Sequence, residues 1–261
     1  MSVRPSIDEV RAVAQAGIIE RRSAEHWAGR LYMRWLSGWA TRWLVSSRVG
    51  RPFTPNRLTV LMIVVGLGAA ALAAWPTLAA AVGVALLIQA YLLLDCVDGE
   101  VARWTRTTGA AGVYLDRLGH HVVESALVVG LGFRAAGGPS PDADWWLVLG
   151  ALTALVVVIG KLESDLVVVA RSGAGLPSAP EADPTSSVGA VRSLRRIFAL
   201  VPLHRLVGAV ELSLLLVVVA VIDTVRADLL ATQVLLVATA GVALLVAVGH
   251  PVTILTSRKL R

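Results

Sequence analysis

The chain has 261 residues, of which 56% are hydrophobic and only 16% are charged, and its mean hydropathy is +0.72. This composition excludes an ordinary water-soluble domain and indicates a membrane protein. The formal net charge is +6, but the basic residues flank apolar segments, so we expect anionic lipid headgroups and no nucleic acid as partners.

Two helices are expected before the first apolar segment. Residues 7–23 predict a short polar helix. Residues 24–49 predict an amphipathic helix, because Trp or Leu recurs every four residues and arginines lie on the opposite side. This pattern is typical of a helix that lies in the membrane interface. The alternative is that the helix packs against the membrane domain and that its tryptophans belong to the core.

Six apolar segments follow a Pro-containing break at residues 51–56, and each is close to the ~20 residues that span a bilayer. The second and the fourth are expected to continue as helix to about Arg103 and Arg171. The expected fold is therefore an all-α polytopic membrane protein, with an N-terminal interfacial segment at 1–50 and a six-helix membrane domain at 51–261. The expected spans are 57–75, 78–94, 113–133, 145–162, 207–222 and 229–249.

The distribution of arginine and lysine predicts the orientation in the membrane. With six spans, 22 of the 24 basic residues fall on one side, and only Arg134 and Arg226 fall on the other. The positive-inside rule then places both termini, and the residues near Asp95, on the cytoplasmic side of the cell membrane.

Ionisable residues gather between Asp95 and Glu124, beside or inside apolar segments, where such residues are costly and commonly functional. At about 100° per residue, Asp95 and Asp98 share one face of a helix. Asp116, His120 and Glu124 share one face of the next helix. Because carboxylate oxygens suit Mg²⁺ or Mn²⁺, these faces predict a metal–diphosphate site where two membrane helices meet.

A longer pattern runs through the same residues. It reads Asp95-x-x-Asp98-Gly99-x-x-Ala102-Arg103 and, after eight residues, Gly112-x-x-x-Asp116. This pattern resembles the signature of the CDP-alcohol phosphotransferase family. The upstream Thr54-Pro55-Asn56-x-x-Thr59 is similar to that family's entry into its first membrane helix.

The resemblance implies an enzyme of phospholipid biosynthesis. It would transfer a substituted phosphate group from a CDP-alcohol to an acceptor alcohol, release CMP, use two Mg²⁺ or Mn²⁺ ions and form a homodimer. The implied metal ligands are Asp95, Asp98 and Asp116. The implied nucleotide- and diphosphate-binding residues are Gly99, Ala102, Arg103, Gly112, Pro55, Asn56 and Thr59. Read without the resemblance, the last three form a helix start with a proline and a cap.

CDP-diacylglycerol is the expected donor, because a site at the boundary of membrane and cytosol suits a lipid donor and a polar acceptor. One alternative is a soluble CDP-polyol or CDP-amino-alcohol donor with a lipid acceptor. Another is a membrane scaffold that has lost catalysis. A transporter is disfavoured, because the acids cluster at one membrane face and no internal repeat is visible.

One position departs from the family pattern. The signature ends with an Asp four residues after the third Asp, and this chain has His120 there. The family's last Asp is its proposed general base, so we expect His120 to be catalytic, either as the base or as a residue that orients the site. The alternatives are a metal ligand and a sign of lost activity. Glu124 either orients His120, or it is a buried residue that pairs with another helix or is protonated. His121 lies off the acidic face and is expected to be structural.

The candidate residues for binding the acceptor alcohol are all basic. Family members that use a phosphorylated acceptor bind its phosphate in a basic pocket, which the resemblance places near residues 161–196. The same charges also fit anchoring at the lipid headgroups. The residues concerned are Lys161, Arg171, Arg192, Arg195 and Arg196.

Overall fold

A computed structural model describes residues 5–256, except for 17–25, 48–51, 140–143 and 177–207. All regular elements in these residues are helices, as expected for an all-α protein. Four of the helices are long and apolar enough to cross a membrane. They are α3 (Pro55–Ala73), α4 (Leu78–Thr105), α6 (Trp145–Gly173) and α9 (Leu230–Thr256).

The other two expected spans are also helical, but they carry more charge. α5 (Ala110–Ala135) contains Asp116, Glu124 and Arg134 among its apolar residues. α8 (Ala209–Arg226) contains Glu211 near its start and Asp223 and Arg226 near its end. The structure therefore has four clearly apolar helices of membrane-spanning length, and the count of six spans stays a prediction.

The helix ends follow local sequence signals. α3 begins at Pro55, whose fixed φ suits the first position of a helix. α4 continues past its apolar part to Thr105, as predicted, and α6 likewise continues past Arg171. At the end of α4, Arg106 has φ +57° and the N–H of Thr107 donates to the carbonyl of Ala102 at 2.9 Å. This turn closes the helix and leads directly into α5.

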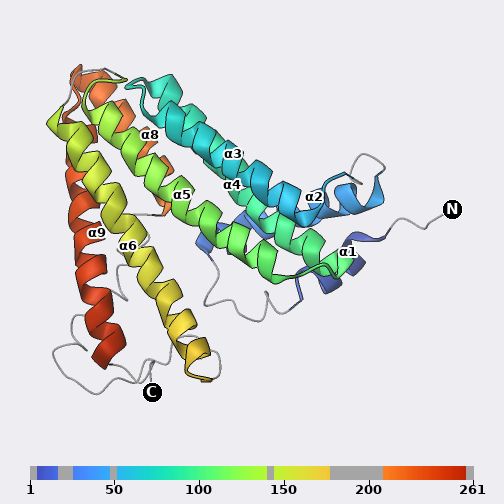
Figure 1. Cartoon of the computed structure of the whole chain (residues 1–261). Helices are drawn as coiled ribbons and strands as arrows, with labels where there is room; N and C mark the ends of the chain where they lie inside the picture. The colour runs from blue at the N-terminus through green and yellow to red at the C-terminus, as the bar shows by residue number, and fades with distance from the viewer. Residues whose placement is uncertain (1–4, 17–25, 48–51, 140–143, 177–207, 257–261) are drawn as a thin grey trace. The chain divides into compact units, whose positions relative to one another are not determined.

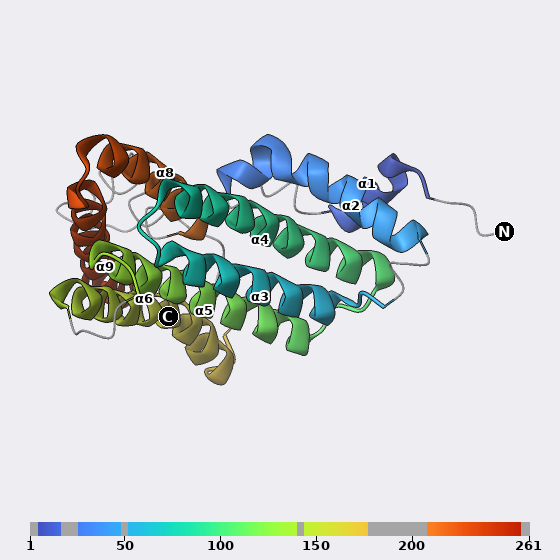
Figure 2. The same cartoon turned by 90° about the horizontal axis from the view of Figure 1, so that it is seen from above.

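The chain divides into two units, the first formed by Met1–Gly68 and Leu86–Val122, the second by Ala69–Ala85 and Val123–Arg261. α3, α4 and α5 each give one part to each unit. In the first unit, the end of α4 lies beside the N-terminal helices, and the beginnings of α3 and α5 lie on the other side of α4 (Figure 2). The domain boundary expected near residue 50 stays a prediction.

The N-terminal helices belong to the first unit. α1 (Ile7–Ala14) begins with a capping box, in which Ser6 and Glu9 each accept a hydrogen bond from the backbone N–H of the other. A π-helical turn, η2 (Gly29–Met33), leads into α2 (Arg34–Ser46), and α1 packs against α2. Of the helix predicted at 7–23, the structure has the first part, and residues 17–25 lie outside the described residues.

The tryptophan-rich face of α2 is exposed. Trp35, Trp39 and Trp43 are 59%, 43% and 57% exposed, whereas Ser37 and Thr41 on the other side are fully buried. The alternative in which the tryptophans form a core is therefore wrong for these three residues. The polar side, and not the aromatic side, packs against protein, which leaves the predicted interfacial location as a prediction.

The second unit packs closely at small residues. A Cβ atom at Gly150 of α6 would lie 2.7 Å from the Cα of Gly132 of α5, and one at Gly130 would lie 2.3 Å from the carbonyl oxygen of Ala70. Such contacts let helix backbones approach each other, as in many membrane proteins. α9 packs against both α6 and α8 (Figure 1).

A buried arginine in the second unit forms hydrogen bonds to the loop between α3 and α4 and to the start of α9. Arg134 is 1% exposed and donates to the carbonyls of Trp75 and Thr77 at 2.6 and 3.2 Å, and to Oγ1 of Thr232 at 3.3 Å. The hydroxyl of Thr232 in turn donates to Asp223 at 2.5 Å. Asp223 also accepts from two backbone N–H groups at the start of α9. Arg134 is one of the two basic residues that the charge distribution places on the non-cytoplasmic side. Its contacts give it a structural role.

Candidate metal centre

Two helix faces meet in the first unit. A short turn joins α4 to α5, and the face of α4 that carries Asp95 meets the face of α5 that carries Asp116 and His120. α3 approaches α5 at Gly119, where an added Cβ would lie 2.7 Å from Cγ1 of Ile63. The glycine before His120 therefore allows three helices to pack closely around the site.

Asp95, Asp116 and His120 converge at this point. One ligand atom from each lies within 4.8 Å of the other two. Nε2 of His120 lies 3.1 Å from Oδ1 of Asp95 and 3.5 Å from Oδ1 of Asp116. The three side chains are 25–43% exposed, so small solutes can reach them. Two carboxylates and one imidazole form a donor set that fits Mn²⁺ or Mg²⁺ and leaves coordination positions for a substrate.

The third predicted metal ligand, Asp98, has a different environment. It is 7% exposed, and its Oδ2 accepts a hydrogen bond of 2.5 Å from the hydroxyl of Thr59. Thr59 is itself 3% exposed. The structure therefore brings His120, rather than Asp98, together with Asp95 and Asp116. It also gives Thr59, predicted as a nucleotide neighbour, a direct bond to a carboxylate of the motif.

Tyr91 belongs to the site and was not predicted. Its hydroxyl lies 2.7 Å from Nδ1 of His120, and the two rings meet edge-on at an interplanar angle of 89°. Tyr91 is 2% exposed. It precedes Asp95 by four residues and so lies on the same face of α4. That spacing was the available signal, but a tyrosine in an apolar helix is ordinarily part of the core.

The predicted nucleotide-binding residues of α3 and α5 lie near one another. Pro55 is the first residue of α3, which agrees with the proline of the helix-start interpretation. Asn56 is exposed, and a Cβ atom at Gly112 would lie 3.5 Å from its Oδ1. The exposed amide and the bare backbone of Gly112 leave this side open to a ligand, and the nucleotide contact itself stays a prediction.

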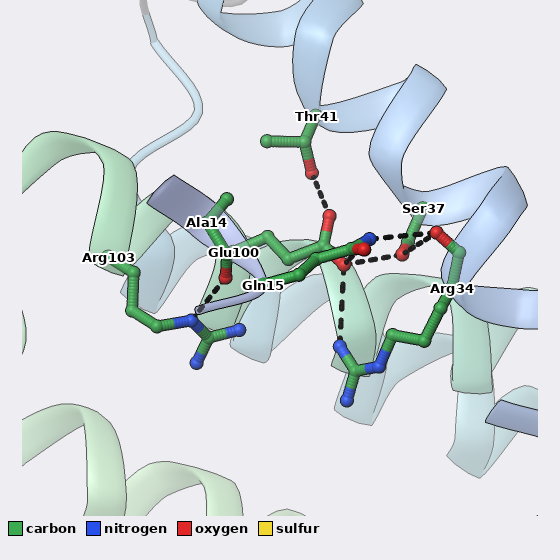
Figure 3. A network of polar contacts seen from close by, with 7 residues as sticks. All are labelled: Ala14, Gln15, Arg34, Ser37, Thr41, Glu100 and Arg103. Carbon is green, nitrogen blue, oxygen red and sulfur yellow. Dashed lines mark hydrogen bonds and ion pairs between the residues drawn. The ribbon is translucent and has the colours of Figure 1, made fainter. Parts of the chain in front are cut away.

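The predicted residues of α4 are partly exposed, and one of them has an unexpected partner. Gly99, Ala102 and Arg103 follow Asp98 along the helix. Nε of Arg103 donates to the carbonyl of Ala14, the last residue of α1 (Figure 3). A Cβ atom at Gly99 would lie 3.2 Å from Nη1 of Arg103, so the guanidinium lies over the glycine. The absence of a side chain at Gly99 therefore makes room for the guanidinium.

Glu124, Lys161 and Arg171 lie in the second unit. Nζ of Lys161 is 2.9 Å from Oε2 of Glu124, so the alternative of a carboxylate paired with another helix is the one observed. Arg171 is 6% exposed. Arg192, Arg195 and Arg196 lie outside the described residues.

His121 bonds within its own helix. Its Nδ1 is 2.5 Å from the carbonyl oxygen of Arg117, one turn earlier. A contact of this kind stabilises the side chain against α5. It agrees with the prediction of a structural role.

Comparisons with known proteins add no assignment. No protein-family model matches the chain. No curated protein matches it either. The resemblance to the CDP-alcohol phosphotransferases therefore rests on the motif residues, and the convergence of Asp95, Asp116 and His120 marks the candidate site.

Proposed function

We propose that this chain is a membrane transferase similar to the CDP-alcohol phosphotransferases. The observation that carries the proposal is the convergence of Asp95, Asp116 and His120 within 4.8 Å. The first two are signature carboxylates, and the third stands where the signature has its last Asp. The spacing thus predicts a site between two helices, and in the described structure the side chains at these positions do meet.

The donor set supports a divalent cation. Carboxylate oxygens are hard ligands that suit Mg²⁺ and Mn²⁺, and an imidazole nitrogen favours Mn²⁺ over Mg²⁺. A bound cation neutralises the charge of the donor's diphosphate and of the CMP that leaves. The resemblance implies two ions, and holding the second would also require Asp98 as a ligand. Oδ1 of Asp98 would bind the ion, because Oδ2 accepts the hydrogen bond from Thr59.

The proposed reaction is one displacement at phosphorus. The oxygen of the acceptor hydroxyl bonds to the phosphorus nearer the donor's alcohol, and the bond from that phosphorus to the CMP oxygen breaks. The hydroxyl proton leaves to a base. Nε2 of His120 has one lone pair, which either binds the cation or accepts this proton. We favour binding, because Nε2 converges with Asp95 and Asp116 while Nδ1 is bonded to Tyr91.

We further propose the cell membrane as the location, with six spans and with the site and both termini in the cytoplasm. The charge distribution supports this orientation, since only Arg134 and Arg226 would lie outside. CDP-diacylglycerol is the proposed donor and a polar alcohol the proposed acceptor. A homodimer is proposed from the resemblance alone.

Purified protein in detergent tests the proposal. We expect CMP release from CDP-diacylglycerol when Mn²⁺ or Mg²⁺ and the right acceptor are present. The acceptors to screen are inositol phosphate, inositol, glycerol phosphate, serine and ethanolamine. If no acceptor supports CMP release, and if CDP does not raise the melting temperature, the proposal is wrong.

Matched variants connect the activity to the site. Asp95→Asn and Asp116→Asn keep the shape of each side chain but remove its charge, so each should abolish CMP release. Asp228→Asn is the control, because Asp228 is an exposed residue of the loop between α8 and α9 and pairs with Arg226. Normal turnover in either site variant would contradict the metal assignment.

A further inference from the structure

A buried carboxylate on the motif helix is bound by the N-terminal helices. Glu100 follows Gly99 on α4 and is 0% exposed. It accepts hydrogen bonds from Ser37 at 2.5 Å, Thr41 at 2.8 Å and Gln15 at 2.9 Å, and it forms an ion pair with Arg34 at 3.3 Å. All four partners come from α2 or the end of α1 (Figure 3).

Burying Glu100 requires these partners. A buried carboxylate is strongly unfavourable unless it is paired and hydrogen-bonded. Only the N-terminal segment supplies the four contacts described above, so α1 and α2 must be docked for α4 to keep Glu100 inside. Apolar packing supports the docking, since Ala40 and Leu44 of α2 pack against the cluster formed by Leu58, Val97 and Val101.

The same docking fixes a residue of the motif. Ala14 ends α1, and its carbonyl accepts the hydrogen bond from Nε of Arg103. The neighbouring Gln15 donates through the two hydrogens of its Nε2 to Glu100 and to the carbonyl of Arg34, at 2.9 and 2.8 Å. The guanidinium of Arg103 is thus held on its Nε side. Among the described residues, its Nη1 and Nη2 remain as the donors suited to phosphate oxygens.

We propose that α1 and α2 are a positioning element of the site, in which Glu100 locks them to α4 and Ala14 thereby sets the guanidinium of Arg103 over Gly99. The ligand class served by Arg103 is a nucleoside diphosphate. This part of the inference rests on the proposed function, because Arg103 has a diphosphate to bind only if the chain takes a CDP-alcohol. Glu100 touches no substrate and acts through Arg103.

The chain offers a matched pair of variants for the test. Thr41 and Thr232 are both 0% exposed, and each donates its hydroxyl to a buried carboxylate, Glu100 and Asp223 respectively. Thr41→Val and Thr232→Val therefore remove the same chemistry at nearly constant volume. Both should lower the melting temperature of the full chain in detergent. Only Thr41→Val should change the position of Arg103.

The main measurements are the affinities for CDP and for Mn²⁺. We expect Thr41→Val and Glu100→Gln to weaken CDP binding about tenfold, the low end of the loss when a group that orients a binding residue is removed. Mn²⁺ affinity should not change, since Asp95, Asp116 and His120 are untouched. Thr232→Val should leave both affinities unchanged. In an Arg103→Lys background, Thr41→Val should cause no further loss, because the two act through one group.

Each outcome decides a part of the inference. Unchanged CDP affinity in Thr41→Val and Glu100→Gln would overturn the positioning role, and so would an equal loss in Thr232→Val. If the wild type binds no CDP, the positioning role fails together with the proposed function. The lock is tested separately by limited trypsin digestion, in which Glu100→Ala should speed cleavage at Arg30, Arg34 and Arg42. Unchanged cleavage would overturn the lock.

Discussion

The hydroxyl of Tyr91 lies 2.7 Å from Nδ1 of His120, and the other ring nitrogen of His120 lies 3.1 Å from Asp95. The two contacts are on opposite edges of the imidazole, so Tyr91 fixes which nitrogen faces the carboxylates. If Nε2 binds a cation, Nδ1 must carry the proton and donate it to the oxygen of Tyr91. Such partners commonly set the tautomer and orientation of a histidine ligand.

Removing the hydroxyl of Tyr91 should therefore weaken cation binding. We expect Tyr91→Phe to lower Mn²⁺ affinity about 10- to 100-fold, the usual loss for a partner of a ligating histidine. Titration followed by the electron paramagnetic resonance of free Mn²⁺ measures this. Tyr32→Phe is the control. It removes a hydrogen bond of 2.5 Å from the Tyr32 hydroxyl to Gln89, which lies on α4 as Tyr91 does, and it does not affect the contacts of His120. Wild-type affinity in Tyr91→Phe would show that Tyr91 does not orient the ligand.

Patterns within short stretches of the sequence predicted the positions of the long apolar helices and the residues that share a helix face. Hydropathy located α3, α6 and α9, because an apolar run of the right length is a property of consecutive residues. Helical periodicity placed Asp95 and Asp98 on one face and Asp116 and His120 on another. The turn between α4 and α5 then makes the two faces meet, so most of the cluster was predictable.

Contacts between distant segments could not be predicted in this way. Glu100 lies one residue after Gly99 in the motif, yet its partners Ser37 and Thr41 are 63 and 59 residues away. No period or spacing connects them, and only tertiary packing does. The same reason explains the hydrogen bond from the hydroxyl of Thr59 to Asp98, which no spacing in the sequence indicated.

Replacing His120 by the aspartate that stands at this position in the family signature tests the role of His120. If Nε2 is a ligand, His120→Asp should keep the cation site and shift its preference from Mn²⁺ towards Mg²⁺, because a hard oxygen replaces nitrogen. The ratio of CMP release with the two metals measures this preference. His120→Ala is the companion variant, and it should lose activity with both metals. An unchanged metal preference in His120→Asp would favour the base hypothesis, and full activity of His120→Ala would contradict both roles.

The bond between Thr59 and Asp98 should contribute to both stability and activity. Thr59→Val leaves a buried carboxylate oxygen without its donor, which should cost about 1–3 kcal/mol of unfolding free energy. CMP release should also fall, because Asp98 is no longer oriented. Thr153→Val is the control, since the buried hydroxyl of Thr153 donates to the carbonyl of Leu149 in its own helix and, in the part of the chain that the structure describes, to no carboxylate. Loss of stability with full CMP release would limit Thr59 to a structural role.

The ion pair between Lys161 and Glu124 should behave as one unit. Their side chains are 27% and 13% exposed, so removing either partner leaves a poorly solvated charge. We expect Lys161→Met and Glu124→Gln each to lower the unfolding free energy by about 1–3 kcal/mol. The double variant should lose less than the sum, because neither charge is left unpaired.

Unfolding of the same chains in detergent by increasing amounts of SDS measures this coupling. Arg226→Met is the control, because the pair of Arg226 and Asp228 is exposed and exposed pairs contribute little. Additive losses would mean that Lys161 and Glu124 act independently. The pocket hypothesis predicts a different result for Lys161→Met, namely a raised KM for a phosphorylated acceptor at unchanged stability, so stability and KM measured together distinguish an ion pair from a phosphate site.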